Sequence, residues 1–299
     1  MTEEPTLAYQ FRSAKGNLVE PPVLASGARI ADTHCHLNML KERAVAIAHA
    51  ACCGVDLLVD VTDVTDDAAM SYANIDEWFA QAADLLLYTE VEIPAYRLAV
   101  GIHPHNARSY TFEIEERLLS FLHDPRTVVL GEIGLDYHYD LSPRAMQRAV
   151  FERQLDIARD ENIPVTLHIR EAHEDALAIL REAALPEGHV LIHCYNLDYA
   201  TLVPFLELGC SVAFGGPVTF KSGDDAREAA AAVPVDRLMT ETDAPFMAPV
   251  PLRGAECTPA HTVFTAAKLC EIRGLIIPDE RQYEFLEQLR TNAATFFGV

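Results

Sequence analysis

The chain has 299 residues, of which 50% are hydrophobic and 23% are charged, as in ordinary globular proteins. Its net charge of −22 opposes long-range attraction to nucleic acid or anionic membranes, although bound divalent cations can reverse the sign of the potential locally. The seven cysteines are scattered and contain no C-x-x-C pair. The sequence shows no signal-peptide pattern and no apolar segment of membrane-spanning length. We therefore expect a cytoplasmic protein.

Short apolar segments alternate with longer amphipathic segments from about residue 29 onward. The expected strands lie at residues 29–33, 55–61, 97–101, 128–132, 165–168, 190–193, 211–214 and 238–241. Eight strands alternating with helices predict parallel βαβ units and, by their number, an α/β fold of the (β/α)8 TIM-type barrel. A doubly wound open sheet shows the same alternation, so the sequence pattern leaves that alternative open.

The clearest expected helix begins at Ser142 and Pro143, a capping residue followed by proline at the first helical position. It then places Phe151, Leu155 and Ala158 on one apolar face.

Two segments lie outside the repeat. Residues 1–28 contain several prolines and glycines, and we expect them to form an N-terminal arm before a single barrel domain at 29–299. Residues 62–96 are acidic, long for one crossover and contain the only tryptophan, Trp78. We expect an acidic helix beside the barrel there, with some additional loop.

Histidine and acidic residues recur at the C-terminal ends of the expected strands: His34, His36, Glu132, His168, His193 and Asp243. In a barrel these ends share one rim, where barrel enzymes have their active sites. Alternate residues of a strand point to the same side, so the first two histidines can bind one ion together. Burying six such groups without a cation would be costly, and the pattern therefore predicts a divalent metal site.

The remaining histidines outside strand ends are assigned no role: His49, His123, His138, His173, His189 and His261. Cys35 and Cys194 each neighbour a strand-end histidine, and we expect their side chains to point away from the metal site.

Seven short motifs lie between about residue 29 and the C-terminus: ADTHCHL, GIHPHNA, GEIGLDY, PVTLHIREAHEDAL, LIHCYN, TETDAPFMAPVPLRG and TNAATFFGV. Together they resemble the TatD-type metal-dependent deoxyribonucleases, a family of amidohydrolase-like barrels. The resemblance implies a two-metal site and metal-dependent DNA cleavage, commonly with exonuclease character. It implies that Glu132 bridges the ions, one bound also by His34, His36 and Asp243 and the other by His168 and His193.

The sequence departs from the family pattern in two segments beside the expected site. The segment after the second strand is longer than usual and reads DVTDVTDD, and the usual asparagine-containing run is replaced by residues 253–259, RGAECTP. Both are expected to border the substrate groove, so they bear on substrate choice more than on metal binding. The N-terminal arm is also additional.

Mixed imidazole and carboxylate ligands suit two divalent cations such as Zn²⁺ or Mn²⁺ better than an all-oxygen Mg²⁺ cage, although Mg²⁺ fits one open position. A two-metal site activates water for phosphodiester hydrolysis, and Glu132 as the bridge holds the ions close together. Asp243 is the candidate general base, with the alternative that it serves only as a ligand.

Five further residues are candidates for contacts around the metal site. His103 and His105 are expected to contact the substrate or to protonate the leaving group, and a structural role is an equal alternative for each. Arg170 is a candidate phosphate ligand, and Arg253 is a weaker one. Asp136 is expected to orient a neighbouring residue.

We therefore predict a divalent-metal-dependent deoxyribonuclease or phosphodiesterase. The main alternative is an amidohydrolase acting on C–N or carboxylic ester bonds, but many such enzymes bridge their ions with a carboxylated lysine, and residues 126–140 contain none. A noncatalytic metal-binding barrel ranks last because the ligand set is complete. The acidic charge without a Lys/Arg cluster favours DNA ends or single strands held mainly by the metals, and no obligate protein partner is indicated.

Overall fold

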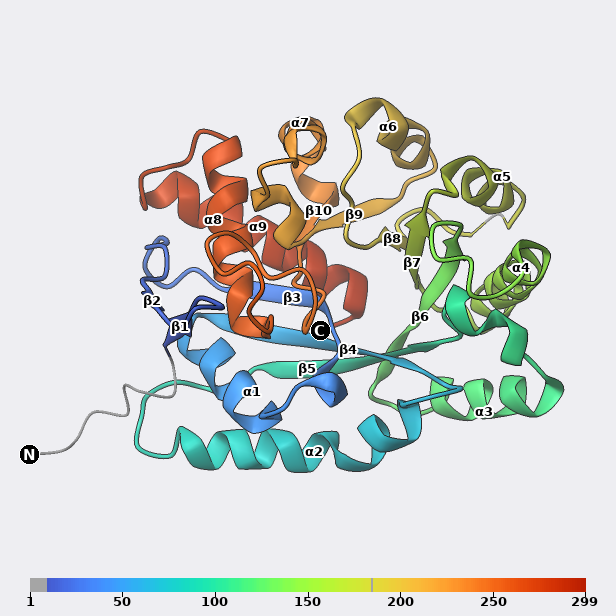
Figure 1. Cartoon of the computed structure of the whole chain (residues 1–299), viewed down its shortest axis with the longest axis horizontal. Helices are drawn as coiled ribbons and strands as arrows, with labels where there is room; N and C mark the ends of the chain where they lie inside the picture. The colour runs from blue at the N-terminus through green and yellow to red at the C-terminus, as the bar shows by residue number, and fades with distance from the viewer. Residues whose placement is uncertain (1–9, 184) are drawn as a thin grey trace, which may run out of the picture.

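The computed structural model describes residues 10–183 and 185–299, and its described strands include eight that form one parallel sheet (Figure 1). The sheet has the order β10-β9-β8-β7-β6-β5-β4-β3, and every neighbouring pair is parallel. The strands are β3 (Ile30–Cys35), β4 (Val55–Asp63), β5 (Ala95–Gly101), β6 (Thr127–Asp136), β7 (Val165–Arg170), β8 (Val190–Ile192), β9 (Ser211–Phe214) and β10 (Leu238–Thr240).

The first and last strands of this sheet come together and nearly close a barrel. The hydroxyl of Thr33 donates to the carbonyl oxygen of Thr240 at 2.9 Å, and the hydroxyl of Thr240 donates to that of Ala31 at 2.7 Å. The (β/α)8 prediction is therefore confirmed, and the open-sheet alternative is wrong.

Helices connect the strands and pack around the barrel. The α-helices are α1 (Arg43–Cys52), α2 (Ala68–Leu85), α3 (Phe112–Leu122), α4 (Arg144–Glu161), α5 (His173–Ala183), α6 (Tyr199–Glu207), α7 (Asp224–Ala232), α8 (Thr262–Ile272) and α9 (Glu280–Phe297). The short 3-10 helices are η1 (Leu37–Met39), η2 (Pro104–Ser109), η3 (Gly216–Thr219), η4 (Val235–Arg237) and η5 (Pro259–His261).

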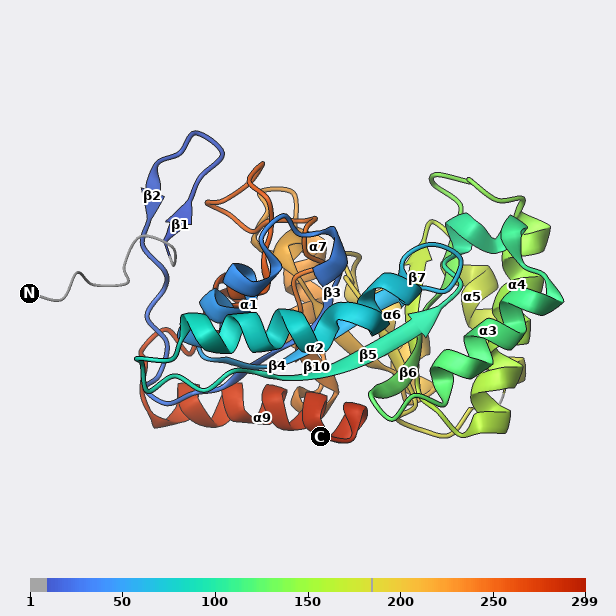
Figure 2. The same cartoon turned by 90° about the horizontal axis from the view of Figure 1, so that it is seen from below.

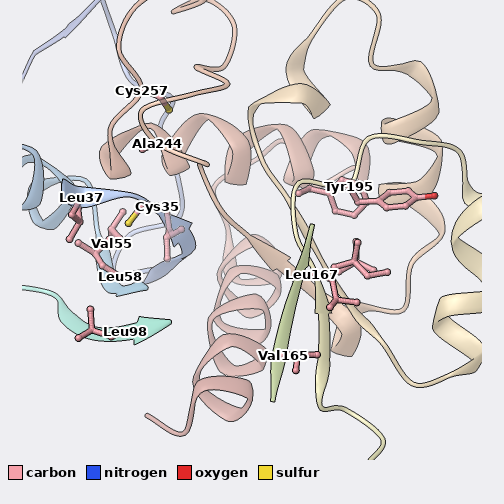
Figure 3. Close-up of a cluster of buried hydrophobic side chains, with 14 of the residues drawn as sticks. Cys35, Leu37, Val55, Leu58, Leu98, Val165, Leu167, Tyr195, Ala244 and Cys257 are labelled. Carbon is pink, nitrogen blue, oxygen red and sulfur yellow. The ribbon is translucent and has the colours of Figure 1, made fainter. Parts of the chain in front are cut away.

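The apolar core has two layers. Between the strands and the surrounding helices lie residues such as Leu58, Leu98 and Leu167 (Figure 3). Inside the barrel a smaller apolar cluster includes Phe297 of α9, and α9 crosses the end of the barrel opposite the loops that follow β3 and β10 (Figure 2). The barrel therefore has an apolar, helix-covered end and an opposite rim formed by strand ends and loops.

One helix start differs from its prediction. The helix α4 begins at Arg144, and its N-cap is Pro143, which has an extended backbone and no side-chain cap. The hydroxyl of Ser142 instead donates to the carbonyl oxygen of His105 at 2.7 Å and accepts from the backbone N–H of Arg108 at 3.0 Å. The predicted capping role of Ser142 was wrong because a contact with η2 uses its hydroxyl.

The described part of the N-terminal arm forms a two-stranded antiparallel hairpin of β1 (Phe11–Arg12) and β2 (Leu18–Val19). Phe11 is buried against the rings of His49 and Phe264, and the hairpin is thereby attached to α1 and α8. Residues 1–9 of the expected arm lie outside the described residues, and the domain boundary at residue 29 stays a prediction.

The acidic segment at 62–96 contains the expected helix, α2, which packs beside the barrel with Trp78 buried. None of the helices in the described part of the chain combines the length and hydropathy needed to span a lipid bilayer.

Candidate metal centre

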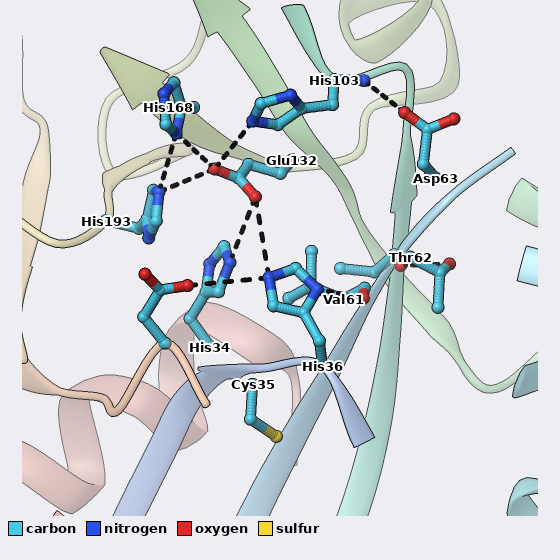
Figure 4. Close-up of polar contacts among 12 residues, drawn as sticks. His34, Cys35, His36, Val61, Thr62, Asp63, His103, Glu132, His168 and His193 are labelled. Atoms are coloured by element: carbon cyan, nitrogen blue, oxygen red, sulfur yellow. Dashed lines mark hydrogen bonds and ion pairs between the residues drawn. The ribbon is translucent and has the colours of Figure 1, made fainter. Parts of the chain in front are cut away.

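The carboxylate of Glu132 on β6 lies at the centre of the rim, and its Oε1 faces histidines from three other strand ends (Figure 4). This oxygen is 2.6 Å from Nδ1 of His168 and 2.7 Å from Nε2 of His193. Nε2 of His103, which follows β5, is 3.5 Å away.

The second oxygen of Glu132 faces the two histidines of the first strand end. Oε2 is 3.3 Å from Nε2 of His34 and 4.0 Å from Nε2 of His36. The same nitrogen of His36 is 3.6 Å from Oδ1 of Asp243, and its Nδ1 is 2.9 Å from the carbonyl oxygen of Val61. The structure thus brings all six predicted ligand residues together.

Backbone hydrogen bonds hold the two sides of this cluster in place. Asp243, which has a left-handed φ of 61°, donates its N–H to the carbonyl oxygen of His34 at 2.9 Å. His36 donates its N–H to the carbonyl oxygen of Ala244 at 2.7 Å. The buried Asp32 accepts hydrogen bonds from both the backbone and the hydroxyl of Thr242. The end of β3 and the loop after β10 therefore form one hydrogen-bonded unit.

The residues present fit divalent cations. Potential ligand atoms lie within 4.8 Å of one another in four groups. Two of them contain only predicted ligands, namely His34 with His36 and Asp243, and Glu132 with His168 and His193. The other two are His34 with His193 and Glu241, and His103 with His105 and His168. The ring of His34 is fully buried, and neither of its nitrogens has a hydrogen-bond partner among residues 10–183 and 185–299. Because uncompensated buried polar groups are costly, a coordinated cation accounts for these nitrogens better than the protein alone does.

Electrostatics keep the two carboxylates in the ionised form that binds metal. Burial opposes the charge of Glu132, but the surrounding histidines, His193 foremost, hold its pKa well below the ordinary value. Burial likewise opposes the charge of Asp243, yet its hydrogen bond with His36 lowers the pKa. For His36, burial lowers the pKa, but Asp243 and Glu132 outweigh burial and raise it to about 9.

A second layer of contacts lies behind His168. Its Nε2 is 3.1 Å from Oδ2 of the buried Asp136, and the same oxygen is 2.8 Å from Nε2 of His105. The other oxygen of Asp136 accepts the backbone N–H groups of His138 and Tyr139. This position is the one expected of a residue that orients a neighbour, although the role itself stays a prediction.

The loop that carries His103 and His105 is fixed by an acidic residue from β4. One oxygen of Asp63 accepts the backbone N–H of His103 at 2.8 Å and the side-chain amide of Asn106 at 3.1 Å. Asp63 belongs to the unusual DVTDVTDD segment, whose part in holding this loop was not evident from the sequence.

The two candidate phosphate-binding arginines lie over aromatic rings. The guanidinium of Arg170 is 4.6 Å from the ring centroid of Tyr139, and that of Arg253 is 3.6 Å from the ring centroid of Phe220. Each guanidinium is therefore held against an aromatic face within the described part of the chain.

Three residues near the centre were missed by sequence reasoning. Glu241 is completely buried, and its spacing from Asp243 repeats the i, i+2 spacing of His34 and His36. Tyr139 and Phe246 are exposed aromatic residues beside two site histidines; Tyr139 follows the motif GEIGLDY, and Phe246 lies within the motif TETDAPFMAPVPLRG. By contrast, Cys35 is placed as predicted, since it points away from the histidines and toward the carbonyl oxygen of Val59 (Figure 4).

The chain is similar to known proteins over most of its length. The family model "TatD related DNase" matches residues 31–298. An uncharacterised metal-dependent hydrolase of Escherichia coli is 34% identical over 259 residues, which cover 85% of this chain and 91% of that protein. A human 3'-5' RNA nuclease is 35% identical over 204 residues, which cover 67% of this chain and 26% of that protein. The crystal structure of a TatD homologue from Escherichia coli has a TM-score of 0.78 at 26% identity, covering 91% of this chain and 99% of that one.

Proposed function

The chain belongs to the TatD-related DNase family of metal-dependent hydrolases, and we propose that it hydrolyses phosphodiester bonds in nucleic acids with two divalent cations. The central position of Glu132, with histidine nitrogens near both of its oxygens, is the observation that carries this proposal. The family description and the description of the human relative as an RNA nuclease support the same bond type.

The proposed ligands form two sets that share Glu132. One set adds His34, His36 and Asp243, and the other adds His168 and His193. This mixture of imidazole and carboxylate suits Zn²⁺ or Mn²⁺. Bound cations supply Lewis acidity, which lowers the pKa of a water molecule and stabilises negative charge on phosphoryl oxygens.

Asp243 is the proposed proton acceptor for the attacking water. It is ionised at neutral pH because the contact with His36 outweighs the effect of burial on its pKa, and its side chain is 14% exposed. His103 is the proposed hydrogen-bond donor to a substrate oxygen; burial lowers its pKa, so its neutral form predominates at neutral pH and it is a poor source of a full proton. His105 and Arg170 complete the proposed substrate contacts.

Exposed aromatic rings near the centre support a preference for single strands or strand ends. Phe246 is 48% exposed, with its ring 6.2 Å from that of His36, and Tyr139 is 54% exposed, with its ring 5.5 Å from that of His105. Unpaired bases can stack on such rings, whereas bases within a duplex are already stacked on each other. The net charge of −22 further disfavours extended contact with duplex DNA.

A substrate panel with metal-reconstituted protein tests the proposal. The panel contains end-labelled single-stranded DNA and RNA, linear duplex, closed circular duplex, and amide and lactone substrates. We expect the highest kcat/KM on single strands, resistance of closed circles, loss of turnover with a chelator and recovery on adding Mn²⁺ or Zn²⁺. Faster turnover of an amide or lactone than of every nucleic acid would contradict the proposed bond type.

A further inference from the structure

Glu241 is a buried carboxylate to which the proposed chemistry assigns no role. Its side chain lies directly after β10 with 0% exposure, and neither carboxylate oxygen has a hydrogen-bond partner in the described part of the chain. A buried polar group without a partner is costly, so the carboxylate requires an interaction that offsets its burial.

The group that faces this carboxylate is the ring of His193. Nδ1 of His193 is 3.6 Å from Oε1 of Glu241, and this nitrogen also has no hydrogen-bond partner among the described residues. On the other side of the same ring, Nε2 is 2.7 Å from Oε1 of Glu132. The imidazole therefore lies between two carboxylates, one at the metal centre and one behind it.

The surroundings of Glu241 leave its side chain little freedom. The backbone N–H of Glu241 donates to the carbonyl oxygen of Phe214 at 3.2 Å, and the next residue, Thr242, is held by Asp32. Gly215 lies so close that a Cβ atom there would be 3.4 Å from both Cγ and Oε1 of Glu241. A shift of about half an ångström closes the 3.6 Å separation to hydrogen-bond length.

The arrangement repeats the one at His168. The ring of His168 also lies between two carboxylates, with Glu132 at 2.6 Å from one nitrogen and Asp136 at 3.1 Å from the other. Both Asp136 and Glu241 are fully buried. Each histidine of the Glu132–His168–His193 group is thus backed by its own buried carboxylate.

We infer that Glu241 is a positioning residue that accepts the Nδ1–H of His193 and thereby keeps the opposite ring nitrogen, Nε2, unprotonated and directed at the metal centre. The inference rests on the proposed metal site. A histidine ligand needs one nitrogen free of its proton, and a carboxylate behind the ring selects that tautomer and raises the basicity of the ligand. In this role Glu241 acts through His193 and is not itself a ligand; one of its oxygens lies within 4.8 Å of a ring nitrogen of His193 and of His34.

Zn²⁺ affinity, measured by competition with a chromogenic chelator, tests this role. Glu241→Leu removes the acceptor at similar volume and should weaken Zn²⁺ binding about 10–100-fold. Glu241→Gln keeps an acceptor oxygen and should recover part of the affinity. Unchanged affinity in Glu241→Leu would overturn the inference.

Asp60→Asn is the control for a change at a buried acidic side chain outside the Glu132–His168–His193 group. Asp60 is also 0% exposed, but its carboxylate accepts the backbone N–H of Leu37 at 2.8 Å. We expect its Zn²⁺ affinity to equal that of the unmodified protein. A loss as large as that of Glu241→Leu would indicate a general effect of changing a buried acidic side chain and would reject the positioning role.

Nitrogen-15 NMR of the histidine rings provides a readout that does not depend on a variant of Glu241 folding. The ring signals of His193 are assigned by their loss in His193→Gln. In the Zn²⁺-loaded protein they should show that the ring proton of His193 is on Nδ1. A proton on Nε2 contradicts the inference. Glu132→Gln distinguishes failure of the proposed metal centre from failure of the role of Glu241. Full Zn²⁺ affinity in Glu132→Gln would contradict the proposed metal centre. Full affinity in Glu241→Leu alone would reject only the role of Glu241.

Discussion

Two groups of buried histidines in this molecule have similar burial but different surroundings. The rim histidines, such as His34 and His193, face the carboxylates of Glu132 and Glu241. The ring of His261, beneath the N-terminal hairpin, lies 5.3 Å from that of Phe11 and accepts the backbone N–H of Thr258 at 3.0 Å. His193 is 7% exposed and His261 is 6% exposed, so burial alone does not distinguish them.

The neighbours of each histidine determine its charge. Burial lowers the pKa of His261 to about 4, and its hydrogen bond with Thr258 does not compensate. Burial also opposes the charge of His36, but Asp243 and Glu132 raise its pKa to about 9. A buried histidine is therefore a candidate metal ligand where carboxylates face it, and a structural residue where aromatic rings and backbone groups face it.

The largest difference between the two groups should appear in turnover. His34→Gln removes a proposed ligand. Loss of a residue that only orients a metal ligand costs up to about 100-fold, so kcat/KM on single-stranded DNA should fall by more than this. His261→Gln should leave kcat/KM unchanged. Initial rates at saturating Mn²⁺ measure both variants.

The thermal stability of the two variants provides the matching control. The melting temperature of metal-free His34→Gln should stay close to that of the unmodified protein, because two buried ring nitrogens without hydrogen-bond partners are replaced by an amide oxygen and an amide nitrogen at the same position. A His34→Gln protein with a normal melting temperature and normal turnover would eliminate the proposed ligand role.

A second, intermediate effect concerns the pH dependence of stability. The pKa of His261 in the folded protein lies below its ordinary value of 6.5, so its contribution to stability is complete above pH 6.5 and is lost as the pH falls through 4. Between pH 7.5 and pH 5 this group should reduce the free energy of unfolding by about 2 kcal/mol. Denaturant titrations of the unmodified protein and His261→Gln measure this loss, and an equal pH dependence in both would show that His261 does not titrate as described.

The smallest expected effect concerns the exposed ring near the rim. Phe246→Ala should weaken binding of single-stranded DNA by about 1 kcal/mol, the lower end of the range for one base stacked on an aromatic residue, because the ring is half exposed. KM for single strands should rise several-fold, while hydrolysis of a phosphodiester without a base should not change. An equal change for both substrates would indicate damage to the metal centre instead of lost stacking.

The alternation of apolar and amphipathic segments was sufficient to predict the eight strands of the barrel. Their ends were less predictable: β6 continues to Asp136, beyond its expected end at Glu132, because pairing with β7 extends it. The hairpin was missed, since strands of two residues are too short to show a periodic pattern. The error at Ser142 has a similar origin, because capping preference is local whereas the contact with η2 is tertiary.

The ligand residues could be predicted because the C-terminal ends of parallel strands share one rim of a barrel. This rule predicted that Asp243 lies near the histidines of the first strand, and the structure places them together. It did not single out Glu241, because the i, i+2 spacing from Asp243 gives no sequence signal that the carboxylate is buried behind a histidine. The flanking rings of Tyr139 and Phe246 also required the three-dimensional arrangement, since they come from loops far apart in the sequence.

The near-closure of the barrel determines when during synthesis this centre can form. Thr33 and Thr240, which join β3 to β10, are separated by 207 positions in the sequence. A chain still emerging from the ribosome contains the histidines of β3 early, but it lacks Glu241 and Asp243 until the segment after β10 has been made, and contacts of such long range form late. The complete metal centre, and with it any hydrolytic activity, is therefore withheld from the unfinished chain.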